Sequence, residues 1–270
     1  MGHQRTGARE VTAMSTQHAG HGTHGGIELA DVGVVVPVDD PPPGAPAQKV
    51  LLHGIDLVLT EPRIAVIGAN GSGKSTLLRL INGLVAPSSG SVAVHGLDTV
   101  RDVRAVRQRV GFVFTDPLSQ LVMPTGREDV ELSLRRRHHG RAERADAAQE
   151  VLDRFGLGPL ADQSVHELSG GERQLMALAA VLAVGPEVLV LDEPSTLLDL
   201  RNRELLRRTL ASLDEQVILS THDLDLAADA DRVLVVEDGG IAFDGDPAAA
   251  VAFYRQLCLD EPAGPARGHS

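Results

Sequence analysis

The sequence predicts an α/β fold built on a central, mainly parallel sheet. Residues 64–67 form a short apolar run that ends at Gly68, and a helix-like apolar pattern begins at Leu77. Residues 188–191 are four consecutive apolar residues, which is typical of a strand buried on both faces of a parallel sheet. Strands that alternate with helices around such a sheet define this fold class.

The N-terminal part of the chain divides into a tail and a β lobe. Residues 1–26 are rich in Gly, His, Thr and Ser and show no periodicity, so we expect a disordered tail. Its histidines could hold a metal loosely, but the composition favours a flexible segment. Residues 27–36 and 50–59 are expected to be strands of an antiparallel lobe, joined by the proline-rich loop 37–49.

A phosphate-binding loop is predicted between the strand 64–67 and the helix that stops at Asn82 and Gly83. Its glycines let the backbone wrap around phosphate oxygens, and the helix N-terminus adds positive potential. The lysine is placed to reach the β and γ phosphates, and the serine hydroxyl is placed to bind Mg²⁺. The loop consists of Gly68, Ala69, Asn70, Gly71, Ser72, Gly73, Lys74, Ser75 and Thr76.

Two carboxylates follow the buried strand 188–191. Asp192 is expected to hold the Mg²⁺ hydration shell, and Glu193 to orient and polarise an attacking water. A helix is expected over residues 201–210. A further apolar strand ends at His222, at the edge of the sheet where ligands of parallel sheets bind, so this histidine is predicted to contact the γ-phosphate.

A helical lobe is predicted over residues 116–170. It leads to Ser169, a predicted helix N-cap, and to the paired glycines Gly170 and Gly171. A capped helix alone would explain the serine but not two glycines, which indicate close approach of a phosphate to bare backbone. The basic segment 135–139 is expected to be a solvated helix end.

The C-terminal part is predicted to contain a hairpin and a tail. Residues 232–236 and 241–243 are expected to be two strands. They flank the turn residues Asp238, Gly239 and Gly240, which predicts a β-hairpin. Residues 258–270 are expected to be a flexible tail.

Composition restricts the function further. The 270 residues are 43% hydrophobic, enough for a large core, and no apolar run approaches the ~18 residues of a membrane span. No secretory signal is evident, and one cysteine, Cys258, excludes an internal disulfide framework. The formal net charge of −12 argues against nucleic acid as a partner.

These motifs, in this order over residues 27–257, resemble the ATPase subunits of ABC transporters. The resemblance implies a P-loop NTPase core with an antiparallel β lobe and a helical ABC lobe, and ATP and Mg²⁺ as ligands. Glu193, His222 and Lys74 would be catalytic. In the family the nucleotide lies between two subunits, so Ser169, Gly170 and Gly171 would act on the partner's nucleotide, and Asp199 would cross the interface.

Within that family the chain is most similar to energy-coupling factor (ECF) transporters for vitamins and transition metals, including the biotin, cobalt and nickel types. The segments that carry this narrower likeness are 110–114, 116–117, 120–121, 124–125 and 128–130. The resemblance implies a peripheral ATPase at the cytoplasmic face of the membrane. Its partners would be an integral-membrane subunit and a second ATPase subunit, either a copy or a paralogue.

Two positions depart from the family pattern. Thr115 stands where the family has a glutamine that senses Mg²⁺, so its shorter hydroxyl side chain becomes the candidate metal contact. Val36 stands where an aromatic normally stacks on adenine, which predicts weaker nucleotide binding. Both departures leave open a nucleotide-sensing regulatory subunit. A non-transport ABC ATPase is a further alternative, although the chain has neither a tandem cassette nor a long insertion.

The segment after Thr115 is the predicted docking surface for the membrane partner. It carries apolar residues that a solitary ATPase would have little reason to expose, and we expect them to line a groove between the core and the helical lobe. They are Leu118, Leu121, Val122, Met123 and Pro124.

Overall fold

The computed structural model describes residues 25–39, 41, 46–196 and 198–260. The predicted N-terminal tail therefore lies outside the described residues, apart from Gly25 and Gly26. The strands are β1 Ile27–Pro37, β2 Gln48–Leu59, β3 Arg63–Ile67, β4 Ser89–Val94, β5 Leu97–Asp98, β6 Val110–Val113, β7 Val188–Asp192, β8 Gln216–Ser220, β9 Arg232–Glu237 and β10 Gly240–Gly245. The helices are α1 Lys74–Ile81, α2 Val103–Arg109, α3 Gly126–Leu134, α4 Arg141–Arg154, α5 Gly170–Leu182, α6 Leu200–Ala211, α7 Leu224–Ala228 and α8 Pro247–Asp260.

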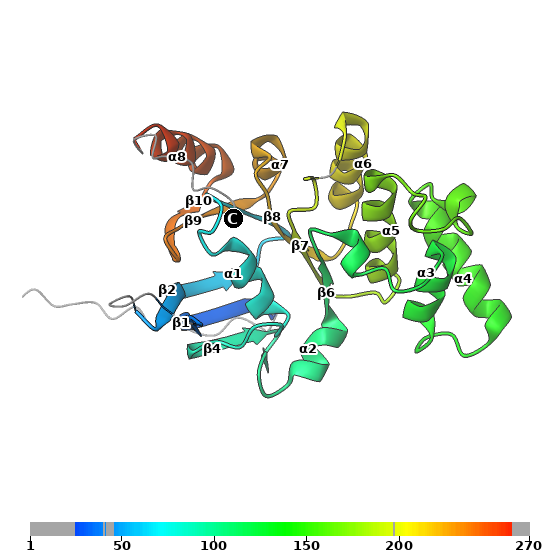
Figure 1. Ribbon diagram of the computed structural model, residues 1–270, viewed down its shortest axis with the longest axis horizontal. Coiled ribbons are helices and arrows are strands. Elements are labelled where there is room, and N and C mark those ends of the chain that lie inside the picture. Colours follow the sequence, from blue (N-terminus) through cyan, green and yellow to red (C-terminus); the bar gives the residue numbers. More distant parts are fainter. Residues whose placement is uncertain (1–24, 40, 42–45, 197, 261–270) are drawn as a thin grey trace, which may run out of the picture.

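The strands form two sheets (Figure 1). The larger has the order β10-β9-β3-β8-β7-β6, in which every pair is parallel except β10 with β9. The smaller is antiparallel, with the order β2-β1-β4-β5. The predicted α/β class with a mainly parallel sheet, an antiparallel lobe and a terminal hairpin is confirmed.

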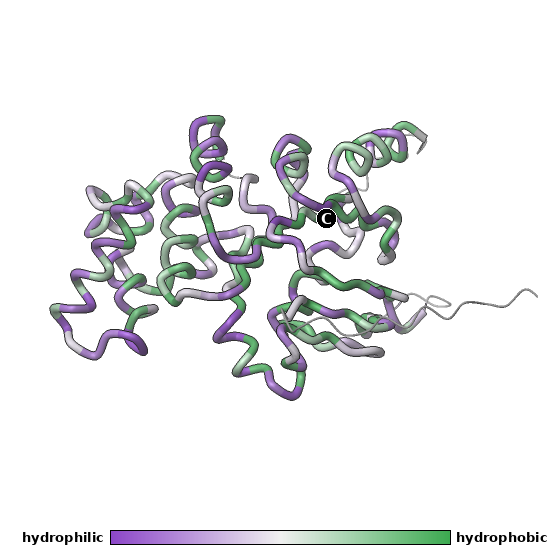
Figure 2. Tube along the Cα trace, turned by 180° about the vertical axis from the view of Figure 1, so that it is seen from behind, coloured by the Kyte–Doolittle hydropathy of each residue, from purple (hydrophilic) through white to green (hydrophobic). Residues whose placement is uncertain are grey.

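The two faces of the parallel sheet belong to different hydrophobic cores. In β3, Ile64 and Val66 pack with α1 and the antiparallel sheet, while Ala65 and Ile67 pack with the helices on the other face. Strand β7 alternates in the same way and is buried along its whole length. Figure 2 shows these hydrophobic strands between helices of mixed hydropathy. A continuous apolar run is therefore required, because neither face meets water.

The helical lobe consists of α3 and α4, which lie beside α5 at one end of the molecule (Figure 1). Helix α3 begins with a capping box, in which Thr125 and Glu128 each satisfy the other's backbone N–H. The segment 135–139 follows the end of α3, and its three arginines are exposed, in agreement with the expected solvated helix end.

Two boundaries differ from the prediction by three residues, and the others by at most two. Helix α1 begins at Lys74 and not at Leu77, because the last residues of the phosphate loop already form its first turn. Helix α8 continues to Asp260, so Cys258 and Leu259 are helical, although we predicted a tail from residue 258. The reason is local: residues 247–260 contain no glycine and no proline after the first position, and the helix ends shortly before Pro262. Among the helices of the described residues, none is long and apolar enough to cross a membrane.

One arginine connects the hairpin to the antiparallel sheet. Arg232 makes a bidentate pair with Asp244, with both distances at 2.6 Å, and contacts Glu61 at 3.1 Å and the carbonyl of Val58 at 2.8 Å. The hydrogen bonds with Asp244 raise the pKa of Arg232. Its side chain is 18% exposed, so these contacts are only partly screened.

We predict that Arg232→Gln lowers the free energy of unfolding by ~1–3 kcal/mol, because it leaves two carboxylates without their guanidinium. Urea unfolding at neutral pH measures this. The matched control is Arg208→Gln, whose side chain is 76% exposed and pairs with Glu204 on the same helix. That change is expected to cost less than ~0.5 kcal/mol. Equal effects of the two changes would contradict the proposed role of Arg232.

Candidate active site

The phosphate loop joins β3 to α1. Two of its residues, Gly73 and Gly71, must be glycine for different reasons. Gly73 caps α1 with φ +115°, and a Cβ there would lie 2.9 Å from the carbonyl oxygen of Leu51. Gly71 has φ +80° and faces open space, with no atom within 4 Å of a built Cβ. The first glycine is therefore needed for packing as well as conformation, and the second leaves the backbone bare on the side where a ligand could approach.

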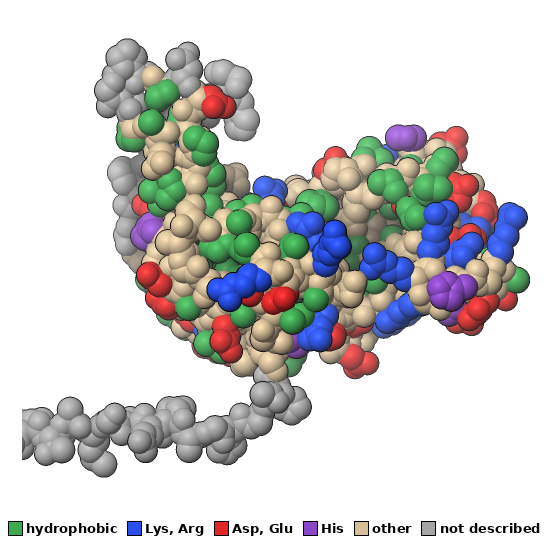
Figure 3. Space-filling view, turned by 90° about the horizontal axis from the view of Figure 1, so that it is seen from below, with side chains coloured by type: hydrophobic (Ala, Val, Ile, Leu, Met, Phe, Trp, Pro, Cys, Tyr) green, Lys and Arg blue, Asp and Glu red, His purple; other side chains and the backbone are tan. Residues whose placement is uncertain are grey.

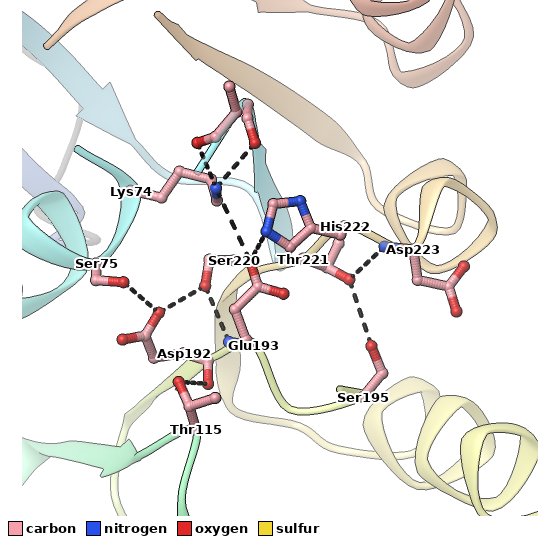
Figure 4. A network of polar contacts seen from close by, with 12 residues as sticks. Lys74, Ser75, Thr115, Asp192, Glu193, Ser195, Ser220, Thr221, His222 and Asp223 are labelled. Atoms are coloured by element: carbon pink, nitrogen blue, oxygen red, sulfur yellow. Dashed lines mark hydrogen bonds and ion pairs between the residues drawn. The ribbon is translucent and has the colours of Figure 1, made fainter. Parts of the chain in front are cut away.

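Lys74 lies inside the loop. Its Nζ donates to the carbonyl oxygens of Gly68 at 2.8 Å and Ala69 at 3.0 Å, and lies 3.9 Å from Oε1 of Glu193 (Figure 4). Burial lowers the pKa of Lys74, whereas the carboxylates of Glu193 and Asp192 oppose that shift. The ammonium group therefore lies at the position where the loop backbone is predicted to bind phosphate.

Asp192 is almost fully buried, with 2% of the residue exposed. Its Oδ1 accepts hydrogen bonds from the hydroxyls of Ser75 and Ser220, both at 2.8 Å, and Nη2 of Arg79 lies 3.6 Å from Oδ2. Sequence reasoning missed Ser220 and Arg79. Arg79 follows Ser75 by four residues on one helix, and that spacing could have indicated a shared face.

Glu193 adopts φ +52°, in the left-handed region that residues other than glycine rarely occupy. Its Oε1 lies 3.1 Å from Nε2 of His222, and its side chain is 13% exposed. The carboxylate therefore faces both Lys74 and His222, as Figure 4 shows. Such backbone outliers are found at functional sites more often than elsewhere.

Thr115 lies next to the same pair of carboxylates but contacts backbone. Its hydroxyl donates to the carbonyl oxygen of Asp192 at 3.0 Å. From the sequence we predicted that this hydroxyl contacts the metal. In the structure its hydrogen-bond partner is instead the backbone carbonyl of Asp192.

A cavity of about 250 Å³ opens beside the loop. The hydroxyl of Ser72 is buried and has no hydrogen-bond partner within the described part of the chain. This orphaned donor and the ammonium of Lys74 suit phosphate, and the oxygens of Ser75 and Asp192 are the hard ligands that Mg²⁺ prefers. The residues present therefore fit both a nucleotide and its Mg²⁺. The cavity is lined by Lys49, Leu51, Asn70, Gly71, Gly73, Lys74, Ser75, Thr76, Glu193 and His222.

The second group of predicted residues does not line that cavity. Ser169 is the N-cap of α5, in a capping box with Glu172, as predicted for a capped helix. Asp199 is the N-cap of α6 and accepts from the backbone N–H of Asn202 at 2.8 Å. Both are exposed, and Figure 1 shows α5 well separated from α1. Within one chain the two groups stay apart.

Glycine is required at position 171 by a packing contact that the sequence analysis missed. A Cβ at this position would lie 2.4 Å from Nδ2 of Asn202, so α6 packs against bare backbone of α5 here. This contact comes from within the chain, and it depends on how two helices far apart in the sequence pack.

Comparison with known families agrees with this geometry. The family described as ABC transporter matches residues 52–196, more than half of the chain. The chain belongs to the ABC transporter ATPase family. The match spans the phosphate loop, α5 with the segment before it, and the two carboxylates at the end of β7.

Individual relatives carry related names. The biotin transport ATP-binding protein BioM of Rhizobium etli is 48% identical over 209 residues, which is 77% of this chain and 93% of that protein. The energy-coupling factor transporter ATP-binding protein EcfA1 of Halalkalibacterium halodurans is 41% identical over 202 residues, 73% of this chain and 72% of that protein.

Two solved structures share the fold. That of cbiO1 from Clostridium perfringens, described as part of the complex cbiONQ, has a TM-score of 0.70 at 28% identity and covers 87% of this chain and 95% of its own. The dimeric ATP-binding cassette MJ0796 bound to ADP and Pi has a TM-score of 0.72 at 27% identity, covering 82% and 98%. The P-loop NTPase fold is therefore confirmed, and as an ABC ATPase this chain binds and hydrolyses ATP.

Val36 is the residue that the sequence places at the adenine-stacking position of the family. Val36 in β1 pairs with Lys49 in β2, and Lys49 lines the phosphate-loop cavity. A side chain at position 36 therefore lies one strand away from the cavity wall, where a longer ring could reach toward a base.

We predict that Val36→Tyr tightens ATP binding by up to about tenfold, because one stacked aromatic contributes on the order of 1 kcal/mol. Titration with a fluorescent ATP analogue measures the dissociation constant. The control is Val58→Tyr, at a position in β2 that is 57% exposed. Equal affinity of the Val36→Tyr and wild-type proteins would exclude position 36 from base recognition.

Proposed function

We propose that this chain is the ATP-hydrolysing subunit of an ECF-type importer for a vitamin or a transition metal. Of the three solutes that the sequence suggests, biotin, cobalt and nickel, we propose biotin first. The support is the likeness to BioM of Rhizobium etli and to a second biotin transport ATP-binding protein, from Rhodobacter capsulatus, which is 38% identical.

The observation that carries the catalytic part is the convergence of one ammonium, two carboxylates and an imidazole beside the phosphate loop. Lys74 supplies positive charge to phosphate oxygens, and Asp192 presents a carboxylate that two hydroxyls orient. Glu193 lies at the position from which a water could be aligned and its proton accepted. His222 holds that carboxylate at 3.1 Å and would contact the transferred phosphoryl group. Mg²⁺, when bound, neutralises charge on the phosphates.

The second half of the site points to a partner ATPase subunit. Ser169 and Asp199 are exposed helix caps that do not line the cavity of their own chain. A helix N-terminus with free N–H groups binds phosphate. We therefore propose that two subunits, identical or paralogous, enclose two nucleotides, with each signature segment, Ser169 to Gly171, facing the phosphate loop of the other. The dimeric form of the similar cassette MJ0796 supports this arrangement.

The membrane partner is proposed to dock in a groove between the core and the helical lobe. A cavity of about 320 Å³ lies there, lined by residues of α2, β6, α3 and α5. The carboxylate of Asp129 accepts from the N–H groups of Val122 at 3.2 Å and Met123 at 3.0 Å, which holds this segment against α3. Val122 lines the groove and is 68% exposed.

The surface around α2 combines hydrophobic and basic side chains. Figure 3 shows the molecule from the side on which α2 lies in Figure 1, with Lys and Arg spread among hydrophobic groups. Of the five predicted groove residues, Val122 alone lines this cavity, so the prediction must be corrected for Leu118, Leu121, Met123 and Pro124. Leu121 is 7% exposed and belongs to the hydrophobic core, since the chain turns inward after the 3₁₀ turn at 117–119. We propose that a cytoplasmic helix of an integral-membrane subunit fills the groove and holds the ATPase at the cytoplasmic face of the membrane. The net charge of −12 supports a protein partner and not nucleic acid.

Dimerisation around ATP provides the first test. Glu193→Gln is expected to retain ATP binding and lose turnover, because it keeps the size of the side chain but removes the charge that accepts a proton. ATP should then convert the protein to a stable dimer, measured by size-exclusion chromatography with light scattering. Adding Ser169→Arg in that background should return it to a monomer.

The control for steric and charge effects is Ser212→Arg in the same background, at the exposed C-terminal end of α6. It should leave the ATP-dependent dimer intact. A dimer that survives Ser169→Arg would contradict the proposed arrangement of the two subunits, and wild-type turnover in Glu193→Gln would remove the catalytic role of that residue.

The docking groove provides the second test. Val122→Asp replaces an exposed apolar side chain of the groove by a charge and should abolish co-purification with a co-expressed ECF-type membrane subunit, while basal ATPase activity stays within about twofold of wild type. Val58→Asp, at a position on β2 that is 57% exposed, is the control and should co-purify normally. Normal co-purification of Val122→Asp would reject this surface.

A further inference from the structure

A single peptide bond, between Asp192 and Glu193, is held at both ends by hydroxyl groups. Its carbonyl oxygen accepts from the hydroxyl of Thr115 at 3.0 Å, and its N–H donates to the hydroxyl of Ser220 at 2.9 Å. Figure 4 shows the two hydroxyls on either side of this peptide. Each comes from a strand next to β7: Ser220 ends β8, and Thr115 follows β6.

The position of this peptide explains why it needs such support. The regular pairing of β7 with β8 ends at Asp192 and Ser220, so the strand ladder no longer holds the backbone of Glu193. Glu193 has φ +52°, and the following Pro194 restricts its backbone further. A residue stays in such a conformation only where its surroundings impose it. This conformation also directs the carboxylate toward Lys74 and His222.

Ser220 contacts the side chain of Asp192 as well as the backbone of Glu193. It is fully buried, and its hydroxyl also donates to Oδ1 of Asp192 at 2.8 Å. The same Oδ1 accepts from Ser75 in the phosphate loop. Ser220 therefore orients the side chain of Asp192 and the backbone of Glu193 together, whereas Thr115 acts on the peptide alone.

We propose that Thr115 and Ser220 are positioning residues that clamp the Asp192–Glu193 peptide in the conformation that hydrolysis requires. This role gives Thr115 a function that does not involve the metal. It rests on the ATPase activity of the family and on the assignment of Glu193 as the catalytic carboxylate.

The first experiment compares Thr115→Val, which removes the hydroxyl at nearly constant volume, with Thr115→Ser, which keeps it. For Thr115→Val we expect kcat to fall about five- to tenfold, with the dissociation constant for a fluorescent ATP analogue within about twofold of wild type. Thr115→Ser should restore kcat to within about twofold. Equal kcat in wild type, Thr115→Val and Thr115→Ser would overturn the clamp.

A Mg²⁺ titration separates this role from a metal ligand. A clamp predicts that Thr115→Val lowers kcat without raising the Mg²⁺ concentration for half-maximal activity, whereas loss of a ligand raises that concentration. Ser220→Ala should both lower kcat and raise the Mg²⁺ requirement, because it also frees Asp192. A raised requirement in Thr115→Val would overturn the proposal for Thr115.

Hydrogen–deuterium exchange provides a readout that does not depend on activity. Exchange of the backbone over residues 188–196 should increase in Thr115→Val and in Ser220→Ala, and unchanged exchange in both would overturn the clamp. The matched control is Thr99→Val, since Thr99 is 1% exposed and its hydroxyl has no hydrogen-bond partner in the described part of the chain. That variant should change neither kcat nor exchange at residues 188–196.

Failure of the clamp can be distinguished from failure of the proposed docking surface. If Val122→Asp co-purifies normally with the membrane subunit, the docking surface is rejected, while the clamp is still tested by the basal kcat of the isolated Thr115→Val subunit.

Discussion

The buried carboxylate of Asp192 is the interaction on which the site depends. A charged group with 2% exposure must find polar partners, because transferring it out of water without them is very costly. Its partners come from α1 and from β8: the hydroxyls of Ser75 and Ser220, with Arg79 nearby. These contacts attach the phosphate-loop helix to the parallel sheet. The loop therefore keeps a defined position relative to the end of β7, where the second carboxylate lies.

Asp192 and Glu193 are neighbours with opposite environments. Asp192 ends the strand ladder and is surrounded by donors, whereas Glu193 leaves the ladder with a left-handed backbone and directs its carboxylate toward Lys74 and His222. Burial lowers the pKa of Lys74, and the two carboxylates oppose that shift, so the charges of the site support one another. The change in backbone direction between two adjacent residues thus separates the proposed metal-binding carboxylate from the proposed proton acceptor.

The surfaces proposed for the two partners face outward. The caps of α5 and α6 carry exposed Ser169 and Asp199, and the groove beside α2 exposes Val122. These surfaces suit the second ATPase subunit and the membrane subunit, respectively. The segment 115–120 begins at Thr115, which bonds to the Asp192–Glu193 peptide, and ends at Gln120, which lines the groove.

The sequence by itself determined the features that follow from contiguous residues. The phosphate loop, the buried β7 run, the cap at Ser169 and the terminal hairpin depend on local backbone preferences and on hydrophobic periodicity, and both can be read along the chain. Only the tertiary structure determined which distant groups meet. Ser220 and Thr115 hold the Asp192–Glu193 peptide because β8 and β6 flank β7 in the sheet, an order that no local pattern encodes. Leu121 turns into the core, and Gly171 packs against Asn202, for the same reason: side-chain contacts depend on neighbours in space, whereas the sequence specifies neighbours along the chain.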